Sequence, residues 1–562
     1  MASLTQPIST EPADRGSARE NQPEGNKLSS TDCHPIDVAP GLSRLFLDYC
    51  AGDPAARPFY PSMPPDPSWQ NRPAIPKPWS ELVSLIAAQN TSPSTAAALD
   101  ALRAGAGTVV TGQQVGLFGG PLFTPFKAAT ALARARQATQ AGRPHVAIFW
   151  IASEDHDFDE INHVTFPSRK ELRKLVYQNA PATTRPVGGI VLDETIEPLI
   201  EQAWELLGSS DKMEELVAAY KPGRTFSQAF AEFYAKAFAA QGLLILDAEG
   251  RDFHRLGAPV LRDAIERADE LHSALVERNR ALETAGYHAQ VAVAPGSSLL
   301  FLIDGSDGAR LALKRVAATA TDPKGLWQAG REKYSTEDIL GILETEPERI
   351  SPSALLRPVF QDYLLSTSLI IGGPAEIAYF AQSAVLYEKI LGRVTPAEPR
   401  LSASLIEPAI GELMRQHDLS LERVFAGNTE SLAQLLAARA MPIEGKRKIA
   451  AAGTALDNEL APLLEWMQSL DEGLGRSAET AASKMRYQMN RLRNMAANFQ
   501  MQRDASFARH AEAITQALYP DGVLQERLHG AAYYFARYGF ELAETMTAQA
   551  ADTCPGHKAI WL

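Results

Sequence analysis

The chain has 562 residues, which at roughly 150 residues per domain allows two to four folded units. Apolar residues make up 45% of the sequence and charged residues 22%, which excludes a largely disordered, collagen-like or disulfide-stapled protein. The formal net charge of −13 argues against a large nucleic-acid interface, because phosphate binding needs a cationic surface. Small molecules or proteins are the expected partners.

The spacing of the cysteines and the lengths of the apolar stretches bear on where in the cell the protein is found. Cys33, Cys50 and Cys554 lie far apart with no Cys-x-x-Cys pair, so neither a disulfide framework nor a thiolate zinc site is predicted locally. The first 35 residues lack the apolar core of a signal peptide, and no stretch approaches the roughly 18 apolar residues of a membrane helix. We expect a cytoplasmic protein with no membrane partner.

The N-terminal region is poor in core-forming residues. Residues 1–36 are rich in Ser, Thr, Pro, Glu and Gly, and we predict a disordered tail because they bury too little apolar surface to offset the entropy of ordering. The Pro-rich stretch from Pro54 to Pro78 contains Phe59, Tyr60 and Trp69, which suits an extended segment lying across a folded surface.

From about residue 80, short apolar runs alternate with longer segments at helical spacing. The runs are Thr108–Thr111, Val146–Ala152, Leu243–Asp247, Val291–Ala294, Leu299–Asp304 and Ser368–Ile371. Near-continuous apolar strands between helices indicate a parallel sheet covered on both faces, so we predict a Rossmann-like, doubly wound α/β core over residues 37–425. Stretches near 165–240 and 305–350 are too long for simple crossovers and are expected to be insertions.

The C-terminal third changes character. Apolar residues from Leu456 to Phe499 mostly alternate in steps of three and four, a heptad-like seam typical of a coiled coil. We predict a helical arm over residues 426–520 that folds as a hairpin and dimerises, with the segment around Leu432–Ala440 as a candidate antiparallel partner. The alternative is a long helix packed on its own core. Residues 521–562 are expected to pack back on the α/β core.

In a doubly wound sheet, ligands bind beyond the carboxyl ends of the strands, and the first candidate segment there is TVVTGQQVGLFGGPLFTPFK, residues 108–127. Lys127 falls in the first turn of the predicted helix, where a cation opposes the helix dipole and suggests a compensating anion. A tight turn with a solvated lysine explains the spacing equally well, and no GxxxxGK[ST] or GxGxxG motif is present. The candidates to hold a phosphate or carboxylate are Thr111, Gly112, Gln113, Gln114 and Lys127.

The second segment is HVAIFWIASEDHDFDEINH, residues 145–163, where an apolar strand ends in five carboxylates and an imidazole within seven residues. Such crowding raises carboxyl pKa values unless a cation, metal or substrate amine relieves it, which makes the cluster a candidate site. His156 suits a general base or an orienting donor. The alternatives are that the acids cap a helix or pair with basic residues of 169–174, or that a metal is bound. The conceivable metal ligands are His156, Asp157, Asp159 and His163, without a recognised metal spacing.

The third segment is LLSTSLIIGGPAEIAYFAQ, residues 364–382. A strand runs into Gly372 and Gly373, which leaves loop amides free to face a ligand, and Glu376 and Tyr379 fall near the same crevice. A plain strand-to-helix turn explains the glycines almost as well. Upstream, Arg357 presents a planar fork that suits a carboxylate, or else it forms a structural pair.

Four segments together resemble the cysteine ligase family of bacillithiol biosynthesis, whose proposed reaction adds L-cysteine to glucosaminyl-malate in the last step. The segments are TGQQVGLFGGPLFTPFK at 111–127, FWIASEDHDFDEINH at 149–163, LLRPVFQD at 355–362 and GGPAEIAYFAQ at 372–382. The resemblance spans most of residues 40–550. It implies a Rossmann-type core with connecting-peptide insertions, a coiled-coil domain that promotes homodimers, and the two substrates L-cysteine and glucosaminyl-malate.

The resemblance also implies roles for the candidate residues. Amide formation from a free acid and an amine needs an activated acyl group, so ATP is expected from the chemistry, although no nucleotide motif is present. His156 with Asp157 or Asp159 would bind and deprotonate the glucosamine amine. The remaining candidates for substrate or nucleotide binding are the loop residues and Lys127, with Glu154, Asp155, Arg357, Gly372, Gly373, Glu376 and Tyr379.

Two other classes of function remain open from the residues. One is a metal-dependent hydrolase or deacetylase built on the Asp and His cluster. The other is a non-catalytic nucleotide-binding scaffold that recruits partners through the coiled coil.

Overall fold

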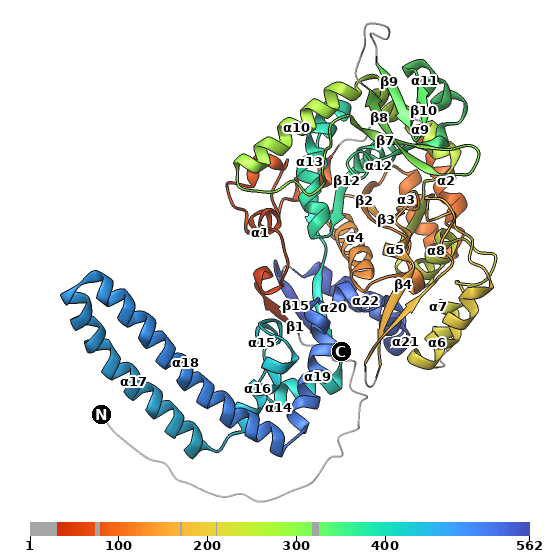
Figure 1. Ribbon diagram of the computed structural model, residues 1–562. Helices are drawn as coiled ribbons and strands as arrows, with labels where there is room; N and C mark the ends of the chain where they lie inside the picture. The colour runs from red at the N-terminus through yellow and green to blue at the C-terminus, as the bar shows by residue number, and fades with distance from the viewer. Residues whose placement is uncertain (1–30, 73–78, 169–170, 209–210, 317–324, 553) are drawn as a thin grey trace, which may run out of the picture.

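The computed structural model describes residues 31–72, 79–168, 171–208, 211–316, 325–552 and 554–562 (Figure 1). The predicted tail falls outside the described residues up to position 30, whereas Thr31–His34 form strand β1. Phe59, Tyr60 and Trp69 of the Pro-rich segment are buried, and the Tyr60 hydroxyl donates to the carbonyl oxygen of Ile377 at 2.9 Å. These aromatic side chains hold the segment against the folded body.

A five-stranded parallel sheet in the order β13-β12-β2-β3-β6 forms the centre of the molecule. Its strands are β2 (Gly107–Gln113), β3 (His145–Ile151), β6 (Leu244–Asp247), β12 (Thr367–Gly372) and β13 (Ala397–Pro399). Alternate residues point to opposite faces, so that Phe149 stacks on Tyr234 while Trp150 meets Phe360 on the other side. Both faces are apolar, which explains the unbroken runs and confirms the predicted doubly wound core.

Helices cover both faces of this sheet. On the Phe149 face lie α4 (Phe123–Gln140), α8 (Phe226–Ala237), α21 (Ala531–Tyr538) and α22 (Glu541–Ala551). On the Trp150 face lie α1 (Arg44–Ala51), α2 (Trp79–Gln89), α3 (Ala96–Arg103), α9 (Arg251–Glu266), α10 (Ala268–Thr284), α12 (Arg357–Leu365) and α13 (Pro374–Leu391). The last two helices before the C-terminus thus complete the core of a sheet that begins more than 400 residues earlier.

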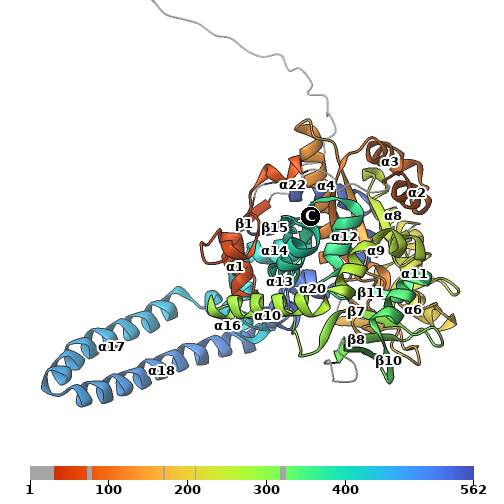
Figure 2. The same cartoon turned by 90° about the horizontal axis from the view of Figure 1, so that it is seen from above.

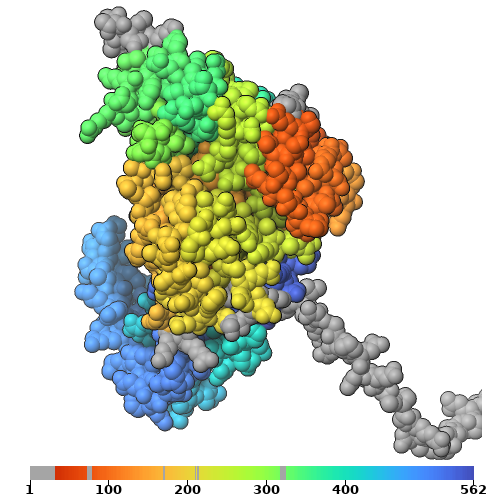
Figure 3. All heavy atoms as spheres, turned by 90° about the vertical axis from the view of Figure 1, so that its right-hand side faces the viewer, coloured from red at the N-terminus to blue at the C-terminus, as the bar shows by residue number. Residues whose placement is uncertain are grey.

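Two insertions extend the core (Figure 3). The first, yellow in Figure 3, carries α5 (Phe158–Ile161), the hairpin β4 (His163–Pro167) and β5 (Leu172–Val176), α6 (Glu197–Leu207) and α7 (Asp211–Val217). The second, green, is an antiparallel sheet in the order β10-β9-β8-β7-β11. Its elements are β7 (Ser297–Ile303), β8 (Arg310–Val316), β9 (Leu326–Ala329), β10 (Glu332–Tyr334), β11 (Ile350–Pro352) and α11 (Thr336–Thr345).

Two of the predicted core strands are therefore assigned wrongly. The run Leu299–Asp304 belongs to β7 of the antiparallel sheet, and Val291–Ala294 forms a loop with no strand. A short apolar run signals burial, but its periodicity does not distinguish a parallel core strand from a buried strand of another sheet or a buried loop.

The C-terminal domain is built around a second small sheet, in the order β1-β15-β14. Its strands and short helices are β14 (Ser402–Ile406), β15 (His557–Trp561), α14 (Pro408–Gln416), α15 (Leu421–Phe425), α16 (Thr429–Ala440), α19 (Ser506–Leu518) and α20 (Gln525–Leu528). Arg400 and Glu526, both buried, join the core to this domain through a two-pronged ion pair at 2.6 and 3.0 Å.

A disulfide joins Cys33 of β1 to Cys554, 521 residues away in the chain. The cysteine spacing argued only against a local disulfide framework, and this bond joins residues far apart in the chain. The antiparallel pairing of β1 with β15 brings the two ends of the described chain together, and no local spacing signals that pairing. Cys50 remains a free thiol.

The helical arm is a hairpin of α17 (Ile443–Leu470) and α18 (Glu472–Arg503) that projects from the body (Figure 2). The apolar seam read as continuous is broken at Asp471, which caps α18, so its two halves lie on antiparallel helices. The main partner of α18 is α17, while the predicted partner, in α16, packs on α18 near the body. No helix in the described part of the chain is both long and apolar enough to cross a bilayer.

Candidate functional site

The three candidate segments reach one edge of the parallel sheet, as predicted. Gln113 at the end of β2 is level with Ile151 at the end of β3, and Ile151 is level with Asp247 at the end of β6. On the other side, Thr111 is level with Ile371 of β12. The loops that follow these strands therefore emerge side by side, where doubly wound folds bind ligands.

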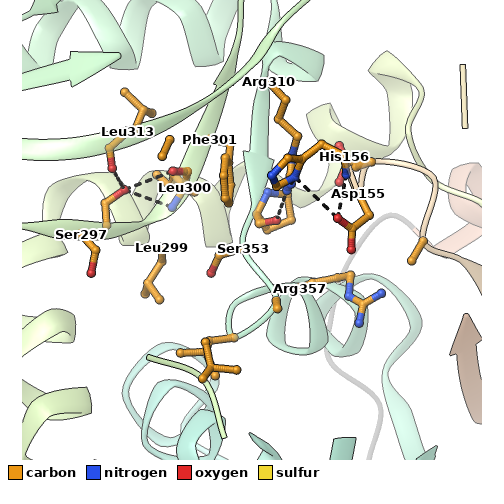
Figure 4. A pocket seen from close by; sticks show the side chains of 18 of the residues that line it. Asp155, His156, Ser297, Leu299, Leu300, Phe301, Arg310, Leu313, Ser353 and Arg357 are labelled. Carbon is orange, nitrogen blue, oxygen red and sulfur yellow. Dashed lines mark hydrogen bonds and ion pairs between the residues drawn. The ribbon is translucent and has the colours of Figure 1, made fainter. Parts of the chain in front are cut away.

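A cavity of about 340 Å³ opens beside the end of β3 (Figure 4). The second insertion supplies one wall of it through β7 and β8, so the cavity lies between the parallel sheet and the antiparallel sheet. Its ionisable lining residues are Glu154, Asp155, His156, Glu249, His272, Arg310, Lys314 and Arg357. Both signs of charge thus face one small space.

Asp155 is held by donors on two sides. Its carboxylate accepts from Gln114 Nε2 at 2.6 Å and from the backbone N–H of His156 at 2.7 Å. Burial opposes ionisation, but these hydrogen bonds, with Arg310 and Arg357 nearby, outweigh it and lower the pKa of Asp155. The side chain is therefore an ionised carboxylate with a fixed orientation at neutral pH.

His156 lies between a guanidinium and a carboxylate, because its Nδ1 is close to Arg310 and is also 3.6 Å from Oδ1 of Asp155. Arg310 Nη1 lies 2.9 Å from His156 Nδ1, and since a guanidinium only donates, this contact assigns the lone pair to Nδ1 and the proton to Nε2. Burial first, and then Arg310, lower the pKa of His156, although Asp155 and Asp157 oppose them. The imidazole is consequently neutral at pH 7. Arg310 also stacks on Phe301 and donates to the carbonyl of Pro352.

Asp157 and Asp159 lie outside the lining of the cavity. Asp157 caps α5 by accepting from the backbone N–H of Glu160 at 3.2 Å, and both aspartates are exposed. Helix capping, one of the alternatives for this cluster, therefore accounts for Asp157. Of the basic residues downstream, Arg173 pairs with Glu171, and positions 169 and 170 lie outside the described residues.

Lys127 joins the first and third segments. Its buried ammonium donates to the carbonyl of Gly112 and to Gln113 Oε1, both at 2.8 Å, and forms an ion pair with Glu376. An ammonium has three N–H groups, so all of its donors have protein acceptors. The compensating anion that the helix position of Lys127 suggested is Glu376 of this chain. Glu376 also accepts from the backbone N–H of Gly373 at 2.8 Å, which occupies that amide.

The Gly-rich loop after β2 turns toward the protein interior. The backbone N–H of Gly119 donates to the Tyr220 hydroxyl oxygen at 2.9 Å, and its carbonyl oxygen accepts from the Tyr234 hydroxyl at 2.7 Å. At φ +81° a Cβ on Gly119 would collide with the ring of Phe233. These contacts explain why glycine is needed there, and they do not fit a loop that cradles a phosphate.

Arg357 connects the cavity to the third segment. Its guanidinium donates to the Tyr379 hydroxyl at 3.2 Å and lies below the Asp155 carboxylate in Figure 4. Burial alone would lower the pKa of Arg357, but Tyr379, Glu376 and Asp155 outweigh it. Arg357 is thus a permanent cation beside a permanent anion.

Other residues of the site were missed in the sequence. Arg310 lies 154 residues from His156 in the chain, and His254, which has no triad-like context, forms an ion pair with Glu154 at 2.9 Å. Burial together with Asp247 and Glu154 raises the pKa of Glu249 to about 7. In the sequence, the one signal for these residues was Asp247, the acidic residue that ends the apolar run Leu243–Asp247.

Among the described residues, no group of three or more His, Cys, Asp or Glu side chains has an arrangement that could hold a metal ion. His163, one of the conceivable ligands, instead approaches the carbonyl of Asp159 through Nδ1 at 3.0 Å. The cavity itself combines an extensive apolar lining with charged groups of both signs.

Comparison with known proteins gives matches over nearly the whole chain. Residues 31–401 match the family model described as the N-terminal Rossmann-like domain of the bacillithiol biosynthesis protein BshC. Residues 403–561 match the model of its C-terminal coiled-coil domain. Both the fold of the core and the nature of the arm agree with these descriptions.

Several relatives carry the name "Putative cysteine ligase BshC". The protein of Koribacter versatilis is 40% identical over 543 residues, which cover 94% of this chain and 99% of that protein. That of Solibacter usitatus is 35% identical and covers 85% and 88%, and that of Salinibacter ruber is 31% identical and covers 92% and 96%.

Proposed function

The chain belongs to the BshC family of bacillithiol biosynthesis, and from that membership we propose that it is a ligase that joins L-cysteine to glucosaminyl-malate through an amide bond. This reaction would be the last step of the pathway. The observation that supports the proposal most directly is the pairing of Glu154 and Asp155 with Arg310 and Arg357 around one cavity.

The charges of the cavity complement those of the proposed substrate. Glucosaminyl-malate carries one ammonium group and two carboxylates, so it needs anionic and cationic partners within the length of a small molecule. Glu154 and Asp155 suit the ammonium, while Arg310 and Arg357 present planar forks that bind carboxylates. The volume of about 340 Å³ falls in the range of small-molecule sites.

The amine must lose a proton before it attacks an activated cysteine carboxylate. We assign this task to His156, whose neutral form is the competent one, with Asp155 rather than the exposed Asp157 or Asp159 beside it. Nδ1 is free to accept a proton once Arg310 turns from His156 to a carboxylate of the substrate. Substrate binding would thereby switch on the base.

ATP is proposed as the source of activation on chemical grounds, because an amide does not form readily from a free carboxylate and an amine. The Gly-rich loop and Lys127 do not fit a phosphate site, since Gly119 and the Lys127 ammonium already bond to protein atoms. We therefore assign no step to the nucleotide at these residues.

The reaction would take place in the cytoplasm.

We also propose that the chain is a homodimer that associates through the arm. Large apolar side chains on α17 and α18 are more than half exposed in the single chain, among them Trp466, Leu470, Leu492 and Phe499. Exposed apolar surface of this kind marks an interaction site. Its heptad spacing suits another helical hairpin of the same sequence.

The test is an assay with L-cysteine, ATP and glucosaminyl-malate, followed by mass spectrometry. A product heavier than glucosaminyl-malate by one cysteinyl residue is expected, together with consumption of ATP. Reactions without each component, and with Arg357→Met in place of the wild type, are the controls. A folded wild-type protein that forms no such product would refute the proposal.

A further inference from the structure

His254 lies behind the wall of the cavity, between two oxygen atoms. Its ring is fully buried in α9, with Nδ1 3.1 Å from the carbonyl oxygen of Ile350 and Nε2 2.9 Å from Oε1 of Glu154. The contact with Glu154 is an ion pair when the ring is protonated. The ring of Phe360 packs against the imidazole, with centroids 5.4 Å apart.

Both neighbours of the ring accept hydrogen bonds and carry no hydrogen when Glu154 is ionised. An imidazole satisfies two such acceptors only when both nitrogens are protonated. Burial by itself would lower the pKa of His254, but Glu154, the Ile350 carbonyl and Glu249 outweigh it and hold that pKa above its ordinary value. The geometry and the direction of the pKa shift both favour the protonated ring.

The surroundings of Glu154 make a cation behind it necessary. Glu154 lines the cavity, and Asp247 and Glu249 both lie close enough for their charges to repel it. Arg310 attracts Glu154 but also contacts His156 and donates to Pro352. Three carboxyl groups close enough to repel one another favour a shared proton unless a cation is fixed among them. His254 is placed to supply that charge.

We propose that His254 is a positioning residue: as an imidazolium it fixes Glu154 as an ionised carboxylate at the wall of the cavity, where Glu154 receives the ammonium group of the substrate. The identity of the substrate rests on the proposed function, whereas the charge state of the pair does not. Glu154 and Asp155 then divide their tasks. Glu154 binds the cation, and Asp155, fixed by Gln114, stays beside His156.

The first test needs no substrate. The full chain labelled with ¹⁵N-histidine is examined by NMR at pH 7, with His254→Gln to identify the signals of residue 254 and His417→Gln, in the C-terminal domain, as a matched control. Two protonated ring nitrogens are expected for His254 in the wild type, and a neutral ring in Glu154→Gln. A neutral His254 in the wild type would overturn the proposal, because the pair would then share one proton.

The second test measures steady-state kinetics with glucosaminyl-malate as the varied substrate. His254→Gln and Glu154→Gln are each expected to raise KM roughly 10- to 100-fold with a smaller change in kcat, as loss of a charge-assisted contact predicts. The double variant should have a KM no higher than that of either single variant, because each change disrupts the same His254–Glu154 ion pair. Additive losses would contradict the inference. If the wild type makes no product, the proposed function fails, while the NMR result still determines whether His254 is protonated beside Glu154.

Discussion

Lys127 in the second turn of α4 and Glu376 in the first turn of α13 form a buried ion pair. The pair holds together two loops that leave neighbouring strands of the parallel sheet, one after β2 and the other after β12. Glu376 lies one helical turn before Tyr379 in α13, and the Tyr379 hydroxyl accepts from Arg357 at 3.2 Å. Lys127 and Glu376, which the sequence suggested as ligand-binding residues, therefore act on the site indirectly, by fixing the helix that carries Tyr379.

Breaking this ion pair from one side should destabilise the protein strongly. Lys127→Met and Glu376→Gln are each expected to lower the free energy of unfolding by about 3–5 kcal/mol, because each leaves a buried charge without its partner. The double variant should lose less than the sum of the two. Urea denaturation of all three variants measures this coupling, and additive losses would show that the pair is not an energetic unit.

The pH profile of kcat/KM should report the ionisation of His156. Because its pKa is below the ordinary value, the residue is neutral at pH 7, and activity should fall only as the pH drops through that lowered pKa. Removing the guanidinium with Arg310→Met should raise the pKa and move this acid limb to higher pH. His156→Gln should lose about 10²- to 10⁴-fold in kcat together with the limb itself.

The control for this profile is Arg315→Gln, an arginine of the same strand, β8, that pairs with Asp269 and does not line the cavity. Its profile should match that of the wild type. An acid limb that stays in place in Arg310→Met would show that Arg310 does not set the pKa of His156.

The arm should control the oligomeric state without affecting the folded core. The double variant Trp466→Glu/Leu470→Glu places charges on exposed apolar positions of α17 and is expected to convert a dimer to a monomer. Ser483→Glu, on an exposed position of α18, is the matched control and should remain dimeric. Sedimentation velocity distinguishes the two states, and a wild type that is monomeric at micromolar concentration would contradict the proposed dimer.

The disulfide should act locally on β1. This strand has four residues and lies at the edge of its sheet, so Cys33→Ser is expected to speed amide hydrogen exchange at residues 31–34 while the global free energy of unfolding changes little. A reducing agent should reproduce the effect in the wild type but not in Cys33→Ser. Cys50→Ala is the control. A global loss of about 2–5 kcal/mol would instead place β1 in the cooperative core.

Local patterns along the chain were enough to predict the parallel core and the edge at which its loops meet. Burial on both faces of a strand shows as an unbroken apolar run, as in β3 and β12, and parallel strands place their carboxyl ends at one edge. The heptad spacing likewise predicted a helical arm. It did not locate the reversal at Asp471, because the same spacing continues on both sides of the turn.

Which charges meet depends instead on tertiary packing. Arg310 reaches His156 from the second insertion, and His254 reaches Glu154 from α9, in contacts that depend on how two sheets and a helix pack together. The pairing of Cys33 with Cys554 has the same origin in the register of β1 and β15. Local patterns record whether a residue is buried, whereas the partner of a buried charge is set by distant elements that no spacing along the chain encodes.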